Sequence, residues 1–428
     1  MWLIISKEPV MDSKKIDALF APWDRPDSPG YAVGLVQDGE LIHLRGYGMA
    51  NLEQGQPLDG QSVFYIASVS KQFTAACMVL LAQQGKLALD DDIRLYVPEM
   101  PDYGAPITIR HLIHHTSGLR DYLYLIDLAG RDFEGPISNA DGLALLIRQQ
   151  GLNFPTGQRH LYCNSGYKLM AEIVARVSGL SLRQYAQRHI FAPLGMERTH
   201  FDDDNSPAIA NRVISYRTDD NGGFVPYRKA FTIVGSGGLL TTVEDLVRWD
   251  RNFIDPQVGG PDFIDQMHTC GILNDGTQLD YACGLVVSQY KGLRTVRHGG
   301  GMLGFRTQFL RFPDQGFTAI ILGNLASLDA ADMARKAADI HLAGHFNLAD
   351  YTGSYHSEEL DCTWDFSVAG GDLMLRGLRP KPAALHCAGA DQFRLESVAI
   401  DFRRDDSGRV QGAVVDSGGA QGVEFARV

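Results

Sequence analysis

The sequence has little positive charge and no long apolar run. Its 428 residues carry 39 lysines and arginines against 51 aspartates and glutamates, and the formal net charge is −12. Without a long basic run, such a chain is a poor partner for nucleic acid or an anionic membrane, and we expect neither. No stretch approaches the roughly 20 apolar residues that a membrane-spanning helix needs. With 45% apolar and 21% charged residues, the composition is that of a globular protein.

The sequence also has no C-x-x-C motif, and its first residues do not resemble a signal peptide. Residues Met1–Ile5 are apolar but too few for a signal-peptide core, and Lys7 and Glu8 interrupt them, so we expect residues 1–11 to lie outside the core. The cysteines show neither a C-x-x-C pair nor metal-ligand spacing, which indicates reduced thiols and a cytoplasmic protein. They are Cys77, Cys163, Cys270, Cys283, Cys362 and Cys387.

A cofactor motif is present only in outline. Gly299, Gly301 and Gly304 have the G-x-G-x-x-G spacing of a dinucleotide-binding loop. That loop must open a helix, whereas a strand-like run begins here at Thr307. The spacing therefore does not indicate a nucleotide site, and we expect no cofactor.

The candidate metal ligands lack the other residues of the known metal-binding motifs. His341 and His345 lie four residues apart, without the glutamate of the zinc-protease pattern. The aspartate runs 90–92 and 202–204 lack the glycine and glutamate of a calcium loop. We interpret the histidines as structural and the aspartates as solvated turns, and expect no metal.

Strand-like and helix-like segments alternate in blocks along residues 12–347. Apolar runs around Asp38-Gly39 predict a hairpin, and strands return between residues 295 and 322. Helical periodicity dominates between residues 68 and 200, and another helix is expected at 331–342. This order predicts an α/β (α+β) domain, an antiparallel sheet flanked by helices, with an inserted helical subdomain at about 68–225.

The last 81 residues, 348–428, have a different pattern. Trp364–Val368 alternates between apolar and polar residues, the turn Ala369–Asp372 follows, and a second turn lies at Asp405–Gly408. Short alternating strands separated by turns at this spacing predict a small antiparallel β-barrel as a separate C-terminal domain.

Ser68 and Lys71 lie three residues apart where an extended segment, Val63–Ala67, gives way to an apolar helix. Residues at this spacing share one helical face. The positive end of the helix dipole favours an anion near the serine, and a buried amine can lose its proton near neutral pH. The pair is therefore a candidate nucleophile and base. Alone, such a tetrapeptide more often marks a capped helix start with a solvated lysine.

Two further motifs follow in order. Tyr162-Cys163-Asn164 precedes Ser165-Gly166, and His298-Gly299-Gly300-Gly301 ends a strand. Together with Ser68-x-x-Lys71, they resemble the three signature motifs of the serine β-lactamase and penicillin-binding-protein superfamily. The similarity is greatest to its class C, D-Ala-D-Ala carboxypeptidase, D-aminopeptidase and esterase branch. Supporting segments are similar too: residues 112–119, 193–196, and 237–246. The C-terminal domain is similar to the lipocalin-like barrels of some D-aminopeptidase-like members.

The resemblance implies a role for each matching residue. Ser68 is the acylated nucleophile, Lys71 its helix partner, and Tyr162 a phenol that the nearby ammonium would ionise so that it shuttles protons. Asn164 would hold Lys71 and bind the substrate amide. The backbone N–H groups of Ser68 and Gly301 would form the oxyanion hole.

The strand glycines and the first residue of the third motif complete this implied site. Gly299 and Gly300 would let the strand approach the substrate without a Cβ. The third motif of the superfamily normally opens with lysine, whereas this sequence has His298. Histidine, with an ordinary pKa of about 6.5, is mostly neutral at pH 7 and gives weak support to a substrate carboxylate. The sequence therefore favours D-amino-acid amides, N-terminal D-residues or esters over β-lactams and C-terminal peptides.

Each motif also has a structural interpretation. Tyr162 resembles a core tyrosine, Asn164 a turn former and His298 a strand histidine. Their order and company favour a cofactor-free serine hydrolase of small amides or peptides, working through an acyl-enzyme on Ser68. A carboxylesterase or a weak β-lactamase would use the same site, and a catalytically idle penicillin-binding scaffold or sensor is the alternative of another class. The sequence leaves the oligomeric state open.

Overall fold

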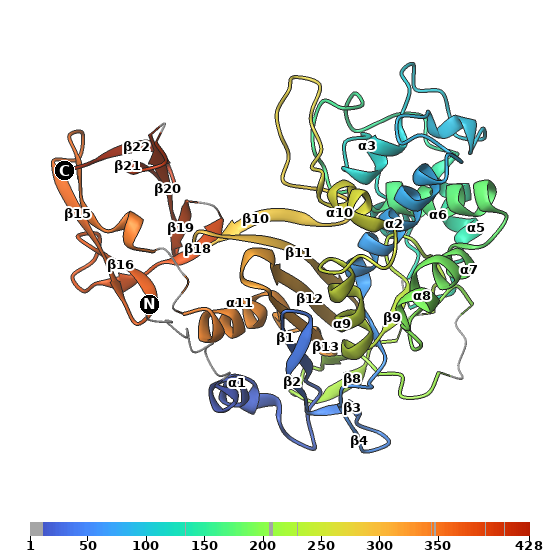
Figure 1. Cartoon of the computed structure of the whole chain (residues 1–428), viewed down its shortest axis with the longest axis horizontal. Coiled ribbons are helices and arrows are strands. Elements are labelled where there is room, and N and C mark those ends of the chain that lie inside the picture. Colours follow the sequence, from blue (N-terminus) through green and yellow to red (C-terminus); the bar gives the residue numbers. More distant parts are fainter. Residues whose placement is uncertain are drawn as a thin grey trace, which may run out of the picture. The chain divides into compact units, whose positions relative to one another are not determined.

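The computed structural model describes residues 12–132, 134–204, 209–228, 230–343, 345, 348–389, 391–405 and 407–428 (Figure 1). It separates into two compact units. Unit 1 holds the described residues up to Val287 with Val296–Arg311 and Gln315–Ala337, and unit 2 holds the described residues of Ser288–Thr295, Phe312–Asp314 and Ala338–Val428. The predicted N-terminal segment 1–11 and the boundary residue 347 lie outside the described residues, and the predicted division at 347/348 stays a prediction.

A six-stranded sheet is built from two distant parts of the chain, residues 31–47 and 286–323. Its strand order is β10-β11-β12-β13-β1-β2, and the pairs β1–β2, β1–β13 and β11–β12 are antiparallel. Asp38 and Gly39 both have positive φ, 51° and 80°, as a two-residue hairpin turn requires, so the predicted hairpin is confirmed. The strands are β1 (Tyr31–Gln37), β2 (Glu40–Tyr47), β10 (Val286–Tyr290), β11 (Leu293–Met302), β12 (Phe305–Phe312) and β13 (Phe317–Gly323).

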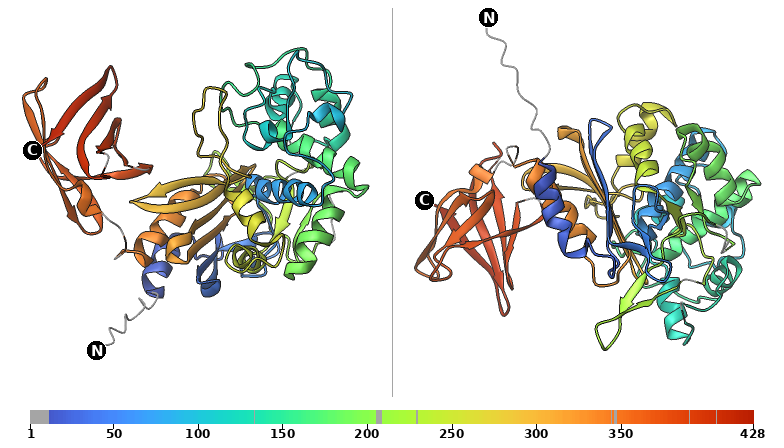
Figure 2. Two further views of the ribbon diagram at one scale, coloured as in Figure 1. Left: turned by 45° about the horizontal axis from the view of Figure 1, so that its top comes forward. Right: turned by 90° about the horizontal axis from the view of Figure 1, so that it is seen from below.

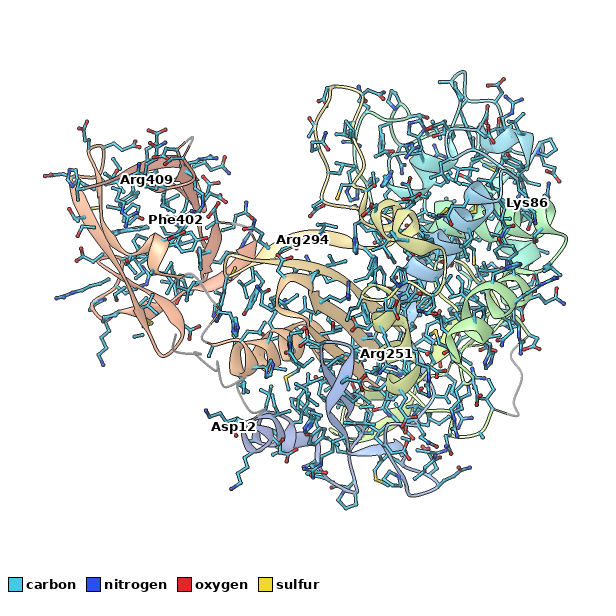
Figure 3. The ribbon with its side chains drawn as sticks, in the orientation of Figure 1. Asp12, Lys86, Arg251, Arg294, Phe402 and Arg409 are labelled. Carbon is cyan, nitrogen blue, oxygen red and sulfur yellow. The ribbon has the colours of Figure 1, made fainter. Side chains whose placement is uncertain are left out.

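Helices cover both faces of this sheet (Figures 1 and 2). Helices α1 (Ser13–Phe20) and α11 (Ala330–His341) lie along one face, and α9 (Val243–Asn252) packs on the other. The α9 contact is close because β1 has a glycine there: a Cβ on Gly34 would lie 2.2 Å from Val243 Cγ1. Arg251 of α9 donates to the carbonyl of Gly39 in the hairpin turn at 3.0 Å (Figure 3).

The helical region predicted between residues 68 and 200 is present. Its helix α2 is buried on all sides from Lys71 to Leu81, as in the centre of a domain. The helices of this region are α2 (Lys71–Gln83), α3 (Ile109–Ile113), α4 (Tyr122–Leu128), α5 (Asn139–Leu146), α6 (Asn164–Ser178), α7 (Leu182–Ala186) and α8 (Ala192–Leu194), and α10 (Gly260–His268) follows further along the chain. Three short strands precede α2: β3 (Met49–Asn51), β4 (Gln56–Pro57) and β5 (Phe64–Tyr65). Four more lie between α8 and α9: β6 (His200–Phe201), β7 (Tyr216–Thr218), β8 (Phe224–Pro226) and β9 (Leu239–Thr241).

The C-terminal strands form a nearly closed antiparallel barrel, as predicted. The strand order is β17-β16-β15-β14-β22-β21-β20-β19-β18. Phe402 lies inside the barrel, 4.9 to 5.7 Å between ring centroids from Tyr351, Tyr355, Phe366 and Phe393 (Figure 3). The strands are β14 (Gly353–Ser357), β15 (Cys362–Ala369), β16 (Asp372–Arg376), β17 (Ala383–Ala384), β18 (His386–Gly389), β19 (Gln392–Leu395), β20 (Val398–Arg404), β21 (Val410–Ser417) and β22 (Ala420–Arg427).

Two sequence predictions need correction. The extended segment Val63–Ala67 contains a strand of only two residues, because Ala67 turns the chain with a φ of +49°. Asp202 is not a solvated turn residue: it is fully buried and forms an ion pair of 2.9 Å with Arg212. Within the described part of the chain, no helix has the length and apolar character to cross a membrane.

Candidate active site

Ser68 lies in a single 3₁₀ turn, Ala67–Ser70, that runs directly into α2. Side chains three residues apart eclipse one another in a 3₁₀ turn, so Ser68 and Lys71 point to the same side. Lys71 Nζ donates to Ser68 Oγ at 3.1 Å. The local helix geometry thus produces the predicted hydroxyl–amine pair.

The backbone before Ser68 is fixed from two directions. Ile66 N donates to the carbonyl of Leu239 in β9 at 3.0 Å, and Thr307 Oγ1 of β12 donates to the carbonyl of Ile66 at 2.9 Å. Between them and Ser68, Ala67 adopts the left-handed conformation, which costs a non-glycine residue about 1–3 kcal/mol. These bonds hold the strained turn and present the serine to the cleft.

Lys71 is fully buried and has three acceptors for its amine. Besides Ser68 Oγ, it donates to Asn164 Oδ1 at 2.8 Å and to the carbonyl of Ser236 at 2.6 Å. Burial lowers the pKa of Lys71 to about 7, although the carboxylate of Asp121 opposes the shift. A large fraction of this lysine is therefore neutral at pH 7 and able to accept the serine proton.

Tyr162 lies on the other side of the amine. Lys71 Nζ is 4.8 Å from the centre of its ring, and Tyr162 lines the cleft with 37% of its surface exposed. Desolvation of the phenol raises the pKa of Tyr162 and favours its protonated form, and the ionisation of the phenol by the ammonium stays a prediction. Because the lysine gives up its proton more readily in this enclosure, Lys71 is the stronger candidate base and Tyr162 a protonated relay.

Asn164 begins α6 and connects Lys71 to a carboxylate that sequence reasoning missed. Its Nδ2 donates to Asp121 Oδ2 at 2.9 Å while its Oδ1 accepts from Lys71. Asp121 in turn caps α4, accepting from Leu123 N at 2.9 Å. The sequence signals only the helix cap, since 43 residues separate Asp121 from Asn164.

Ser236 and Tyr122 were also missed. The Ser236 carbonyl accepts from Lys71, and its hydroxyl is 2.8 Å from the Tyr122 hydroxyl. The sequence indicates only the neighbouring segment 237–246, as one that is similar to the superfamily. A backbone carbonyl has no side-chain signature, so this contact could not be identified from residue types.

His298 is buried in β11 and neutral. Its Nδ1 lies 2.6 Å from the Gly299 carbonyl and its Nε2 3.0 Å from the Tyr281 hydroxyl. Burial and the charge of Lys71 lower the pKa of His298 to about 3. Both ring nitrogens are thus bonded to protein groups, and the ring lies behind Tyr162, 6.2 Å between centroids. It supplies no positive charge for a substrate carboxylate.

The three glycines of β11 differ in position. Gly301 lines the same cleft as Ser68, as an oxyanion pair requires. A Cβ on Gly300 would lie 2.3 Å from the Ile66 carbonyl, and one on Gly299 would lie 2.9 Å from Gln308 Oε1. Gly300 therefore allows the strand to approach the segment before Ser68 rather than the substrate, in contrast to the expectation from sequence.

The cleft has a volume of about 1040 Å³, and its wall is largely apolar. Among the described residues that line it, the charged side chains are Asp121, Asp127 and Arg120, and the buried Lys71 lies next to Ser68. Among the described residues, no cluster of three or more histidine, cysteine or acidic side chains could hold a metal ion. The lining residues include Ser68, Leu123, Tyr124, Leu125, Leu128, Leu161, Tyr162, Asn164, Tyr227, Phe231, Gly301, Met302 and Leu303.

The fold is an antiparallel sheet flanked by helices, and its cleft contains a serine hydrogen-bonded to a buried lysine. These features define the class of β-lactamase-related hydrolases. The beta-lactamase family profile matches residues 16–342, and the chain belongs to that family. It is 28% identical over 395 residues to a D-aminopeptidase of Brucella anthropi, covering 88% of this chain and 72% of the relative.

Solved structures share the fold. The octameric penicillin-binding protein homologue from Pyrococcus abyssi matches with a TM-score of 0.71 at 22% identity, covering 97% of this chain and 100% of the other. The D-amino acid amidase from Ochrobactrum anthropi SV3 matches with a TM-score of 0.64 at 21% identity, covering 77% and 97%. The predicted superfamily and fold class are confirmed.

Proposed function

We propose that the protein hydrolyses small amides or short peptides through an acyl-enzyme on Ser68. Lys71 accepts the Ser68 proton, and Oγ attacks the substrate carbonyl carbon. The N–H groups of Ser68 and Gly301 stabilise the oxyanion, and the proton passes through Lys71 and Tyr162 to the leaving amine. Water, deprotonated by the same pair, then releases the acid and restores the serine.

One observation carries this proposal: the fully buried Lys71 donates to Ser68 Oγ while Asn164 and Ser236 hold the amine in place. A general base in such a position typically contributes about 10²–10⁴ in rate. The polar groups are costly to bury, and together they leave the amine aimed at the hydroxyl. An idle scaffold has no use for that arrangement.

The charges of the cleft support a substrate with a free amino group. Among the described lining residues, Asp121 and Asp127 can accept from an ammonium, and neutral His298 adds no positive charge for a carboxylate. Similarity to a D-aminopeptidase and to the fold of a D-amino acid amidase points the same way. We therefore propose D-amino-acid amides and N-terminal D-residues as substrates. Cys77, Cys163, Cys283 and Cys362 form no disulfide, which supports a cytoplasmic location.

Carboxylesterase activity is the second candidate, because the same site can release an alcohol instead of an amine. A panel of D- and L-amino-acid amides, p-nitrophenyl esters and a chromogenic β-lactam separates the possibilities. We expect higher kcat/KM for D-amides with a free amine than for their N-acetylated forms. Turnover of esters alone would favour the esterase, and no turnover or acylation of any compound would favour an idle scaffold.

A further inference from the structure

His115 is a buried histidine that the chemistry described above does not use. It lies in the loop after α3, only 1% exposed, with its ring 4.4 Å from that of Tyr162 between centroids. We propose that His115 is a positioning residue that holds Tyr162 in register with Ser68 and Lys71. This inference rests on the proposed function, because it gives His115 a role only through the proton relay.

His115 accepts hydrogen bonds from the residues on both sides of Tyr162 in the sequence. The His115 carbonyl accepts from Leu161 N at 3.0 Å, and its Nδ1 accepts from Cys163 N at 3.1 Å. The residues immediately before and after Tyr162 are thus tied to the same residue, and the ring packs against the phenol between them. The backbone carbonyl and the imidazole ring of His115 therefore fix both the position and the tilt of the Tyr162 ring.

The protein tolerates two unfavourable features to keep His115 there. Its φ is +58°, in the left-handed region, and its buried Nε2 has no hydrogen-bond partner among the residues that the structure describes. Both features destabilise a folded chain. Asparagine adopts the left-handed conformation more readily than histidine, so the turn alone does not explain the imidazole.

The contact with Cys163 also fixes the charge of the ring. Since Nδ1 accepts a backbone N–H, the ring proton must lie on Nε2 and the imidazole is neutral. Burial and neighbouring cations keep the pKa of His115 well below its ordinary value. The titratable groups that face the ring are Lys71, His114, His160, His298, Tyr162, Tyr167 and Tyr281.

Two matched substitutions isolate the acceptor. His115→Asn places an amide oxygen close to the position of Nδ1, whereas His115→Gln moves its oxygen one bond further away; both remove the ring and the unpartnered N–H. The measurement is the second-order rate at which a fluorophosphonate labels Ser68, taken in the native background and in Tyr162→Phe. His160→Phe, on an exposed residue whose ring is 5.9 Å from that of His115, controls for changes in the aromatic cluster.

In the native background we expect His115→Gln to slow labelling by about 10- to 100-fold, as misplaced catalytic groups do. His115→Asn keeps the acceptor for Cys163 N and loses only the ring contact, so it should slow labelling by less than about tenfold. In the Tyr162→Phe background, His115→Gln should cost less than about threefold, because the group that it positions is gone. His160→Phe should label at the native rate.

Equal losses in the Asn and Gln variants, or the same fold loss in both backgrounds, would overturn the positioning role. Rates equal to the native one in every variant would do so too. No Ser68 label in the native protein would overturn the proposed function and this inference together. Melting temperatures taken alongside separate unfolding from misplacement: a Gln variant that melts early but labels equally slowly in both backgrounds is merely destabilised, which also refutes the proposal.

Discussion

At the scale of single residues, desolvation moves the pKa values of two neighbouring groups in opposite directions from their ordinary values. Burial lowers the pKa of Lys71 to about 7 and raises that of Tyr162. Near pH 7 a large fraction of the protein then has the neutral amine beside the protonated phenol. In that state the amine can accept the Ser68 proton, and the phenol can pass a proton onward.

The pH dependence of the free enzyme should report Lys71. Because the base must be neutral, kcat/KM for a neutral substrate should rise with pH, pass half its maximum at about pH 7, and level off above pH 8. Lys71→Met should lower kcat/KM by about 10²–10⁴. Initial rates between pH 5.5 and 9 measure both effects.

A matched control for this prediction is a second buried lysine. Lys168 in α6 is 1% exposed, lies 3.7 Å from Glu172 and is not among the residues that line the cleft. Lys168→Met should leave the pH profile unchanged. A native profile that is flat through pH 7, or that follows a group titrating near pH 10, would show that Lys71 is not the base.

At the scale of elements, the active site depends on how closely β11 approaches the turn before α2. The strand carries Gly300 against the Ile66 carbonyl, and Thr307 of the paired strand donates to that same carbonyl. The oxyanion candidates Ser68 and Gly301 belong to these two elements. Their spacing is therefore set by a close approach of two backbones that the Thr307 side chain holds in place.

Gly300→Ala should disrupt this contact. The new Cβ would lie 2.3 Å from the Ile66 carbonyl oxygen and from Thr307 Oγ1, and the backbone oxygen cannot move aside without shifting the serine turn. We expect a loss of about 1–3 kcal/mol in unfolding free energy and at least a tenfold loss in kcat/KM. Urea denaturation and steady-state rates provide the measurements.

Gly301→Ala is the stability control for this prediction. Its Cβ would lie 3.8 Å from Arg306 Nη1, at ordinary contact distance. The unfolding free energy should change by less than about 0.5 kcal/mol. Equal stability of the two alanine variants would show that the close approach at Gly300 does not hold the turn.

At the scale of the whole molecule, histidines kept neutral in the interior make the fold sensitive to acid. The pKa of His114 is lowered by burial to about 4 and that of His298 to about 3. In the unfolded chain both titrate at about 6.5. Below pH 6.5 the unfolded state therefore binds more protons than the folded state, and stability falls as the pH falls.

We expect the unfolding free energy to decrease between pH 6.5 and 4.5, each such histidine contributing up to about 1.4 kcal/mol per pH unit. His114→Asn keeps a donor for the Tyr281 carbonyl but removes the titration. The unfolding free energy of this variant should fall less steeply over that pH range, by up to about 1.4 kcal/mol per pH unit. Identical slopes in the native protein and the variant, from denaturation at each pH, would contradict the assignment.

Much of this molecule could be predicted from local patterns. The hairpin at Asp38-Gly39, the helix after Ser68 and the barrel strands follow from turn residues and periodicity, which act over a few residues. Asp121, Ser236 and His115 could not be found in this way, because their contacts join distant segments or use backbone atoms. The ionisation of Tyr162 stays a prediction, since sequence shows proximity to a lysine but not the desolvation that raises the pKa of the phenol.

The most direct measurement is intact-mass spectrometry of the native protein after reaction with a fluorophosphonate, followed by peptide mapping. We expect a single adduct on Ser68, none in Ser68→Ala, and a variant that melts within about 2 °C of the native protein but has lost hydrolysis. An adduct on another residue, or substantial turnover by Ser68→Ala, would contradict the assignment of Ser68 as the acylated nucleophile.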